Sequence, residues 1–407
     1  MSKIMLLLEK EAAQNKNQEM SGNKPKKNSF ISDLCNLDWI KSKSVPTVIS
    51  QTNAVVTLVD LFSGCGGMTL GVMEALRRHG VALDIKLAVD MNQGALDVYK
   101  HNFNVGSDTA LNIDINELVS INIGKKLSTK EKNVQQKYRN LDILVAGPPC
   151  QGHSNLNNHT RRDDPRNNLY LNAIRFVEVT KPKVAIIENV STVIHDKDQV
   201  VDKSFHALEK MGYTIYSSVI NTSEYGLAQN RKRHVQIAVR NSNKKVNLEN
   251  YKIAKPLTLA DYIKDIANEH KSSKHIYFLP SVTKKINLQR IDYLFENNLY
   301  DLPDKKRPNC HKNKNHSYKS CYGRMRWDKP AQTITSGFGS MGQGRFVHPL
   351  QRRVITPHEA ARIQGFPDFF NFTIINNRGD LHTMIANAVP PKVIAVIISS
   401  LKTNKVL

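Results

Sequence analysis

The chain has 407 residues, 40% of them hydrophobic, which is enough for one large domain and a smaller one. Its net charge of +22 favours a polyanion as partner, most simply nucleic acid, although charge alone also fits a ribosomal or membrane-surface protein. No apolar run approaches the ~20 residues of a membrane span, so no membrane partner is expected. Five unevenly spaced cysteines argue against a disulfide framework and for a reducing compartment.

The first predicted unit follows a polar extension, residues 1–52, to which we assign no chemistry. It consists of a strand at Val55–Asp60, a glycine-rich loop at 61–67 and a helix at Met68–Arg78. Glycines let a ligand approach the backbone, and the amino end of a helix attracts negative charge. The unit therefore predicts a nucleotide-type cofactor site, with Cys65 as a small packing residue.

A second predicted strand, Ile85–Val89, ends in Asp90. A carboxylate at this position can accept hydrogen bonds from the two hydroxyl groups of a ribose. Residues 119–140 are polar and predict a loop with a short helix.

A cysteine follows the next predicted strand, Leu141–Ala146, in the string Gly-Pro-Pro-Cys-Gln-Gly at 147–152. A lone cysteine is usually a small buried side chain. Two prolines that fix the backbone before Cys150 instead favour a thiol held at the carboxyl end of a strand, where open α/β sheets bind ligands. The polar segment 155–168 predicts a closing lid, with an ordinary surface loop as the alternative. A helix is expected at Leu169–Val179.

A carboxyl group ends another predicted strand, Val184–Ile187, which continues as Glu188-Asn189-Val190. A helix at Phe205–Met211 and strands at Thr214–Ile220 and His234–Val239 are expected next. Between these two strands three polar residues alternate, which on a strand puts them on one face. They are Gln229, Arg231 and Arg233.

Residues 241–345 contain 20 Lys or Arg against 9 Asp or Glu, half of the net charge in about a quarter of the chain. Two cysteines and two histidines here suggest zinc, namely Cys310, His311, His316 and Cys321. The spacing of these four residues fits no standard zinc finger, so no metal is expected. Further on, Thr356 with Pro357 and Glu359 predicts a helix that starts with a capping box.

Five strings in this order resemble the motifs of the DNA (cytosine-5) methyltransferases, over about residues 55–400. They are Asp-Leu-Phe-Ser-Gly-Cys-Gly-Gly at 60–67, Pro-Pro-Cys-Gln at 148–151, Glu-Asn-Val at 188–190, Gln-x-Arg-x-Arg at 229–233 and Asn-Ala-Val-Pro-Pro at 387–391. The chain departs from the family at Asp90, where the family usually has glutamate, and at Ala386, where it normally has glycine.

The resemblance implies roles for individual residues. The expected catalytic residues are Cys150 as nucleophile and Glu188 as acid, with Arg233, Arg231 and Gln229. The expected residues of an S-adenosylmethionine site are Asp60, Phe62, Gly64, Gly66, Gly67, Asp90, Asp114, Ile115, Pro148, Asn387 and Ala388.

The implied fold is α/β: a doubly wound, Rossmann-like methyltransferase domain (53–240 and 346–407) with a small target-recognition domain (241–345) inserted. The expected substrate is a cytosine flipped out of double-stranded DNA in the cytoplasm of a bacterium, at the nucleoid. We expect a monomer that acts beside a restriction endonuclease of the same site. Two alternatives stay open: a tRNA cytosine-5 methyltransferase of the same fold, and a non-catalytic DNA-binding relative.

Overall fold

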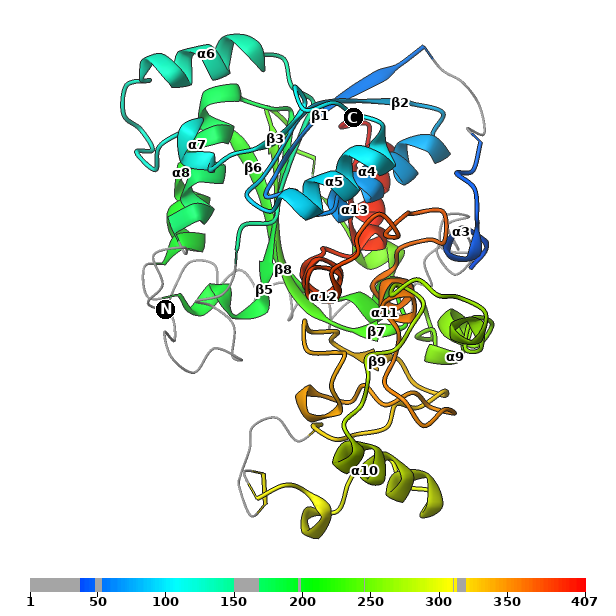
Figure 1. Cartoon of the computed structure of the whole chain (residues 1–407). Helices are drawn as coiled ribbons and strands as arrows, with labels where there is room; N and C mark the ends of the chain where they lie inside the picture. Colours follow the sequence, from blue (N-terminus) through cyan, green and yellow to red (C-terminus); the bar gives the residue numbers. More distant parts are fainter. Residues whose placement is uncertain are drawn as a thin grey trace.

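A seven-stranded sheet in the order β3-β2-β1-β4-β5-β8-β6 forms the centre of the protein (Figure 1). The structure is a computed structural model that describes residues 37–47, 53–149, 168–196, 199–244, 246–309, 311–312 and 320–407. All strands of this sheet run parallel except β8, which is antiparallel to β5 and β6. The strands are β1 Val55–Leu61, β2 Ala82–Asp90, β3 Ala110–Asn112, β4 Ile143–Ala146, β5 Val184–Val190, β6 Tyr213–Asn221 and β8 Lys232–Arg240.

Helices cover both faces of the sheet (Figure 1). One layer contains α4 (Gly67–Arg78), α5 (Gln93–Phe103) and α13 (Pro391–Thr403). The other layer contains α6 (Thr129–Lys137), α7 (Leu169–Thr180) and α8 (Val200–Lys210). This arrangement confirms the predicted doubly wound α/β fold.

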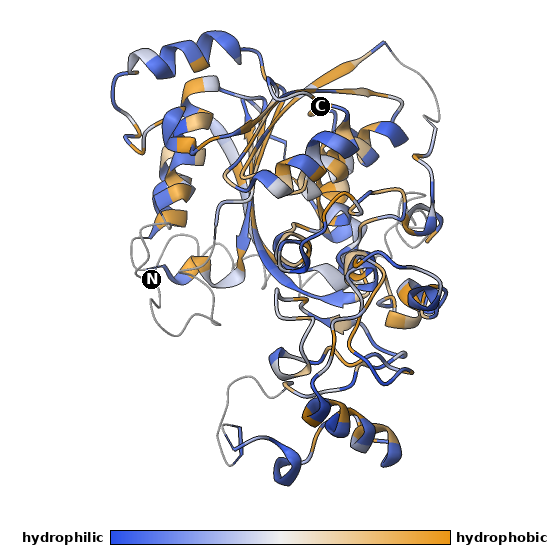
Figure 2. Cartoon of the chain, in the orientation of Figure 1, coloured by the Kyte–Doolittle hydropathy of each residue, from blue (hydrophilic) through white to orange (hydrophobic). Residues whose placement is uncertain are grey.

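The central strands are mostly hydrophobic (Figure 2). The reason is that the side chains on both faces of the sheet are buried. In β4, Ile143 and Val145 pack in the cluster shared with α4 and α13. The alternate residues, Leu144 and Ala146, pack in the cluster shared with α7 and α8. Period-two alternation thus divides each strand between two apolar layers, so neither face needs polar residues.

The last part of the chain returns to the first. Helices α11 (Pro357–Gln364), α12 (Arg378–Asn387) and α13 follow one another, and α13 packs along α4. The stretch Arg378–Thr403 has the length and hydropathy of a membrane span, but 89% of its apolar window is buried inside the protein. It is therefore best explained as core packing.

The inserted region lies at one end of the molecule, in the lower part of Figure 1. Its helix α10 (Lys285–Glu296) packs in a separate small cluster, which includes Leu302, Tyr322 and Val354. The first part of the predicted insert packs elsewhere, because Val246, Leu248 and Tyr251 lie in the cluster of the main sheet.

A two-stranded sheet and a short helix join the inserted region to the rest of the protein. Strands β7 (Gln229–Asn230) and β9 (Ala331–Gln332) pair in a two-stranded sheet, and α9 (Leu259–Ile263) packs on α11. Helix α3 (Asp38–Lys41) packs at the same place, since Trp39 and Ile40 are buried in one hydrophobic cluster with residues of α9, β9 and α11.

Candidate functional site

The glycine-rich loop lies between β1 and α4 and contains three residues with left-handed backbone. They are Phe62 (φ 57°), Gly64 (φ 52°) and Gly66 (φ 95°). A side chain on Gly66 would meet Phe103, because an ideal Cβ would lie 2.2 Å from its ring. A Cβ on Gly64 would meet nothing within 4 Å. The loop is thus closed by packing at Gly66 and open at Gly64, where a ligand can approach the backbone.

Asp90 holds this loop from the end of β2. One carboxylate oxygen accepts a hydrogen bond from the Gly64 amide at 2.8 Å, and the other accepts one from the Asn92 amide at 2.8 Å. Burial raises the pKa of Asp90, while these hydrogen bonds oppose the rise. Asn92 in turn caps α5 by accepting from the Ala95 amide. The predicted ribose-binding carboxylate therefore lies beside the open glycine.

Asp60 lies beneath the loop. It is completely buried, and the Thr69 hydroxyl donates a hydrogen bond to it at 2.7 Å. Burial raises the pKa of Asp60 to about 7. The Thr69 oxygen also lies 2.8 Å from the Tyr99 hydroxyl, so Asp60 anchors α4 and α5 under the site.

Asp114 and Ile115, two of the residues expected at the S-adenosylmethionine site, follow β3, the neighbour of β2. Asp114 caps a short 3-10 turn, accepting from the Asn116 amide at 2.8 Å. Ile115 is buried in the core cluster of the α7 layer. Asn112 donates to the Asp90 carbonyl, which places these residues at the same edge of the sheet as the glycine loop.

The expected nucleophile Cys150 lies outside the described residues, as do 151–167. The described segment before Cys150 ends at Pro149. The Gly147 amide donates to the Leu61 carbonyl at 3.2 Å, so the segment after β4 lies next to the loop after β1. Among the described cysteines, burial raises the pKa of Cys65 to about 12 and raises that of Cys321. Buried thiols of this kind are poor nucleophiles, because the thiolate is the reactive form.

Glu188 and Arg233 meet at the end of β5. The Arg233 Nε lies 2.9 Å from the Glu188 Oε1, and both side chains are mostly buried. Burial raises the pKa of Glu188, and the charges of Arg233 and Arg231 oppose this rise. The Glu188 Oε1 has no aligned hydrogen-bond donor among the described residues despite the close arginine, so the contact is electrostatic.

Asn189 connects this pair to the loop that leads to Cys150. Its side-chain amide donates to the Pro148 carbonyl at 3.3 Å and accepts from the Val190 amide at 2.8 Å. The end of β5 and the Pro-Pro turn after β4 are therefore fixed to one another. This role of Asn189 could not be predicted from the sequence, because its partner is 41 residues away.

Gln229 and Arg231 connect the inserted region to the C-terminal segments. Gln229 donates to the Gln364 side chain at 2.8 Å, and Arg231 donates to the Ala386 carbonyl at 3.0 Å. Gln364, which the sequence did not single out, also donates to the Ile385 carbonyl at 2.7 Å. Arg231 thus holds the backbone of the last motif directly, and Gln229 holds it through Gln364. Of the three residues, Arg233 alone forms an ion pair with Glu188.

The last motif reaches the glycine loop through its backbone. An ideal Cβ on Gly67 would lie 2.3 Å from the Val389 carbonyl oxygen, so only glycine allows this approach. Asn387 is exposed, and the Ala388 carbonyl accepts from Arg231 at 3.3 Å. The methyl group of Ala386 packs in the hydrophobic cluster of α12, so the core accommodates alanine at the position where the family has glycine.

The inserted region carries cationic side chains stacked on aromatic rings. The Arg326 guanidinium lies 4.0 Å from the centre of the Tyr300 ring, and the Lys306 amine lies 4.7 Å from that of Tyr293. Arg326 and Lys306 are exposed. Of the suggested zinc ligands, His311 packs on Tyr322 and Cys321 lies in the small cluster, whereas the other two lie outside the described residues.

Comparisons with known proteins agree in sequence and in fold. Residues 56–403 match the family model of C-5 cytosine-specific DNA methylases. The chain is 42% identical to the Type II methyltransferase M1.BsuMI of Bacillus subtilis, over 90% of this chain and 84% of that protein. It is 31% identical to the Type II methylase M.HgiDII of Herpetosiphon aurantiacus, over 86% and 95%.

Solved structures show the same fold at lower identity. The Spodoptera frugiperda DNMT2 structure superposes with a TM-score of 0.58 at 19% identity, covering 85% of this chain and 99% of that one. The Entamoeba histolytica methyltransferase EhMeth superposes with a TM-score of 0.57 at 17% identity, covering 87% and 99%.

Proposed function

Because the chain belongs to the family of C-5 cytosine-specific DNA methylases, we propose that it transfers a methyl group from S-adenosylmethionine to carbon 5 of a cytosine flipped out of double-stranded DNA. The observation that carries the proposal is the Glu188–Arg233 pair, which Asn189 fixes to the turn two residues before Cys150. An acid and a cation next to the carboxyl end of β5, beside the segment that leads to a cysteine, suit covalent attack on a pyrimidine.

The glycine loop suits S-adenosylmethionine. Gly64 offers open space above the backbone, Asp90 supplies a carboxylate beside it, and α4 directs its positive amino end toward the same region. When bound, this cofactor supplies an electrophilic methyl group. Gly64, Gly66, Gly67 and Asp90 would hold it, with Asp114 and Ile115 toward its base and Phe62, Pro148, Asn387 and Ala388 around it.

Replacing Asp90 with alanine is expected to weaken S-adenosylmethionine binding by about 1–3 kcal/mol, the usual cost of leaving paired polar groups without a partner. Calorimetry on the full chain measures this. The asparagine variant is the matched control, because it keeps the shape and one acceptor for the Gly64 amide, and it should lose less. Unchanged affinity in the alanine variant would remove Asp90 from the site.

The chemistry assigned to this chain's residues begins with the Cys150 thiolate. It attacks carbon 6 of the cytosine and forms a C–S bond, and the ring electrons move toward nitrogen 3, where protonated Glu188 donates. Carbon 5 is then nucleophilic and takes the methyl group. A base removes the carbon 5 proton, the C5–C6 double bond re-forms as the C–S bond breaks, and Cys150 leaves as thiolate. Nitrogen 3 returns its proton to Glu188.

Arg233 has two tasks in this proposal. Its positive charge stabilises the thiolate form of Cys150, and its guanidinium orients Glu188 and the ring carbonyl. The raised pKa of Glu188 favours the protonated form that donation to nitrogen 3 requires.

Double-stranded DNA is the proposed substrate of the inserted region. Its basic composition and the exposed Lys305 and Lys306 suit contacts with phosphates. Since a stacked cytosine cannot reach a thiol at the sheet edge, the base must leave the helix, at a few kcal/mol of unstacking.

Replacing Lys305 and Lys306 together with glutamine is expected to make DNA binding less dependent on salt. Each lost phosphate contact should reduce the log–log slope by about 0.9. Fluorescence anisotropy between low and moderate salt measures the slope. Lys43→Gln with Lys405→Gln removes the same charge from exposed positions outside the inserted region and should leave it unchanged. Equal slopes in both double variants would mean that Lys305 and Lys306 face solvent.

A tRNA substrate is the second candidate, and one assay separates the two. The full chain, with S-adenosylmethionine labelled in the methyl group, is expected to label duplex DNA and to leave tRNA unlabelled. Nucleoside chromatography should recover the label as 5-methylcytosine. Label in tRNA alone would assign the chain to RNA, and label in neither would support a binding protein.

The proposal includes the biological setting. The two similar curated proteins are named Type II methyltransferase and methylase. We propose that this chain likewise acts as a monomer in a restriction–modification pair, protecting chromosomal DNA in the cytoplasm from an endonuclease of the same site.

A further inference from the structure

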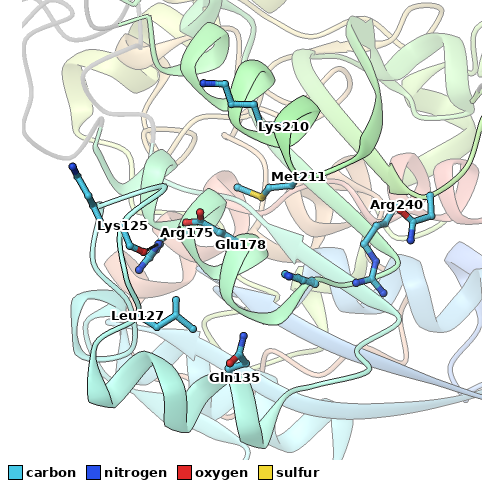
Figure 3. A pocket seen from close by; sticks show the side chains of 10 residues that line it. Lys125, Leu127, Gln135, Arg175, Glu178, Lys210, Met211 and Arg240 are labelled. Carbon is cyan, nitrogen blue, oxygen red and sulfur yellow. Dashed lines mark hydrogen bonds and ion pairs between the residues drawn. The ribbon is translucent and has the colours of Figure 1, made fainter.

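A basic pocket lies beside α6, α7 and α8, near the end of β8 that carries Arg240 (Figure 3). Its volume is about 580 Å³, within the range of small-molecule sites. The walls come from the loop before α6, from α6 and α7, from the ends of α7 and α8 and from the end of β8. The lining residues are Lys125, Leu127, Gln135, Arg175, Glu178, Lys181, Lys210, Met211, Arg240 and Asn241.

The pocket is remote from the methyl-transfer site. Strand β8 has Arg233 near one end and Arg240 at the other. Seven residues of antiparallel strand span about 24 Å, more than the reach of a side chain. A ligand here is therefore neither the cofactor nor the target base.

The charge of the pocket is strongly positive. Five lining residues are basic and one is acidic. Only Arg175 is neutralised, by Glu178 at 2.5 Å and by the buried Glu131 at 2.9 Å behind it. The hydrogen bond from Arg175 lowers the pKa of Glu131, so this partner stays ionised.

The other four cations form no ion pair with the described residues. They are Lys125, Lys181, Lys210 and Arg240. Like charges that line one cavity repel one another, and an anion with several charges reduces this repulsion. In Figure 3 the side chains of Lys125, Lys210 and Arg240 come from three different segments around the cavity.

Lys181 follows the last residue of α7 and forms part of the pocket wall. It adds a fourth cation that has no ion pair among the described residues.

We propose that this pocket is a second anion site, which binds a phosphate-bearing ligand with at least two negative charges. Two sources share this chemistry: a free phosphorylated small molecule, and the backbone of a DNA segment beyond the target site. The site is independent of the methyl-transfer function, since no residue of the pocket belongs to that site.

Lysine acetylation followed by peptide mass spectrometry tests the proposal in the full chain with S-adenosylmethionine present. Tripolyphosphate is the first probe, and a duplex several turns long is the second. Lys125, Lys181 and Lys210 are expected to be protected, while Lys43 and Lys405, exposed on other parts of the protein, react as before. Protection by tripolyphosphate identifies a small ligand, and protection by the duplex alone identifies a DNA backbone.

A variant provides the second measurement. Lys181→Gln with Lys210→Gln is expected to reduce tripolyphosphate or duplex affinity by about tenfold or more, as expected when charged hydrogen-bond partners are lost. Lys43→Gln with Lys405→Gln should have no effect. Protection by neither probe, or equal protection at the control lysines, overturns the proposal. Methyl transfer is read separately, so its loss cannot be confused with loss of this site.

Discussion

A DNA duplex with 5-fluorocytosine at the target position is expected to become covalently attached to the protein when S-adenosylmethionine is present. The Cys150 thiolate adds to carbon 6 and carbon 5 is methylated, but fluorine cannot leave as a cation, so the C–S bond cannot break. The complex should survive a denaturing gel. The Cys150→Ala variant should form none, which makes this the largest expected effect.

The same experiment separates the candidate functions. Cys150→Ala should still bind the duplex reversibly, because phosphate and base contacts lie mostly on other residues. A tRNA enzyme would be trapped on fluorinated RNA, and a binding protein on neither nucleic acid. Crosslinking by the alanine variant would identify another nucleophile and contradict the proposed mechanism. The buried Cys65 and Cys321 are poor substitutes, since burial raises the pKa of both.

Glu188→Gln is expected to slow methyl transfer by about 10²–10⁴-fold, the usual range for a positioned acid. Glutamine keeps the shape of the side chain but cannot deliver a proton to nitrogen 3. DNA binding should survive, so single-turnover rates at saturating DNA measure the chemical step. Rates close to those of the unchanged protein would exclude Glu188 as the acid.

The rate of methyl transfer is expected to fall as the pH rises. Burial raises the pKa of Glu188 in the folded protein, so the protonated form persists to higher pH than in an exposed glutamate. Activity that needs this form should decline as the pH rises through the raised pKa. The same shift means that ionisation of Glu188 lowers the stability of the fold above the ordinary pKa of a glutamate.

Much of the fold could be predicted from local patterns. The strands at 55–60 and 184–187 and the helix at 68–78 are present with ends within three residues, because each combines an apolar run with a glycine or polar stop. Thr356 and Glu359 form the predicted capping box. These features depend on near neighbours in the chain, so sequence alone contains them.

Contacts between distant segments could not be predicted in this way. Gln229 and Gln364 are 135 residues apart and meet only after folding, and the pattern of alternating polar residues gave no sign that Gln229 braces another helix. The bond from Asn189 to Pro148 is another case. The basic pocket combines Lys125, Lys181 and Lys210 from loops and helix ends, and in the sequence each of these is an ordinary surface lysine.

The approach of Val389 to Gly67 affects how the protein matures during synthesis. The ribosome makes the glycine loop early, whereas the backbone that closes over it comes hundreds of residues later, as the contact between Cys65 and Met384 across 319 residues illustrates. A nascent chain is therefore expected to lack the proposed cofactor pocket until translation is almost complete. A premature stop before residue 389 would also remove α13, which covers one face of the sheet, so it should leave the host genome unmethylated.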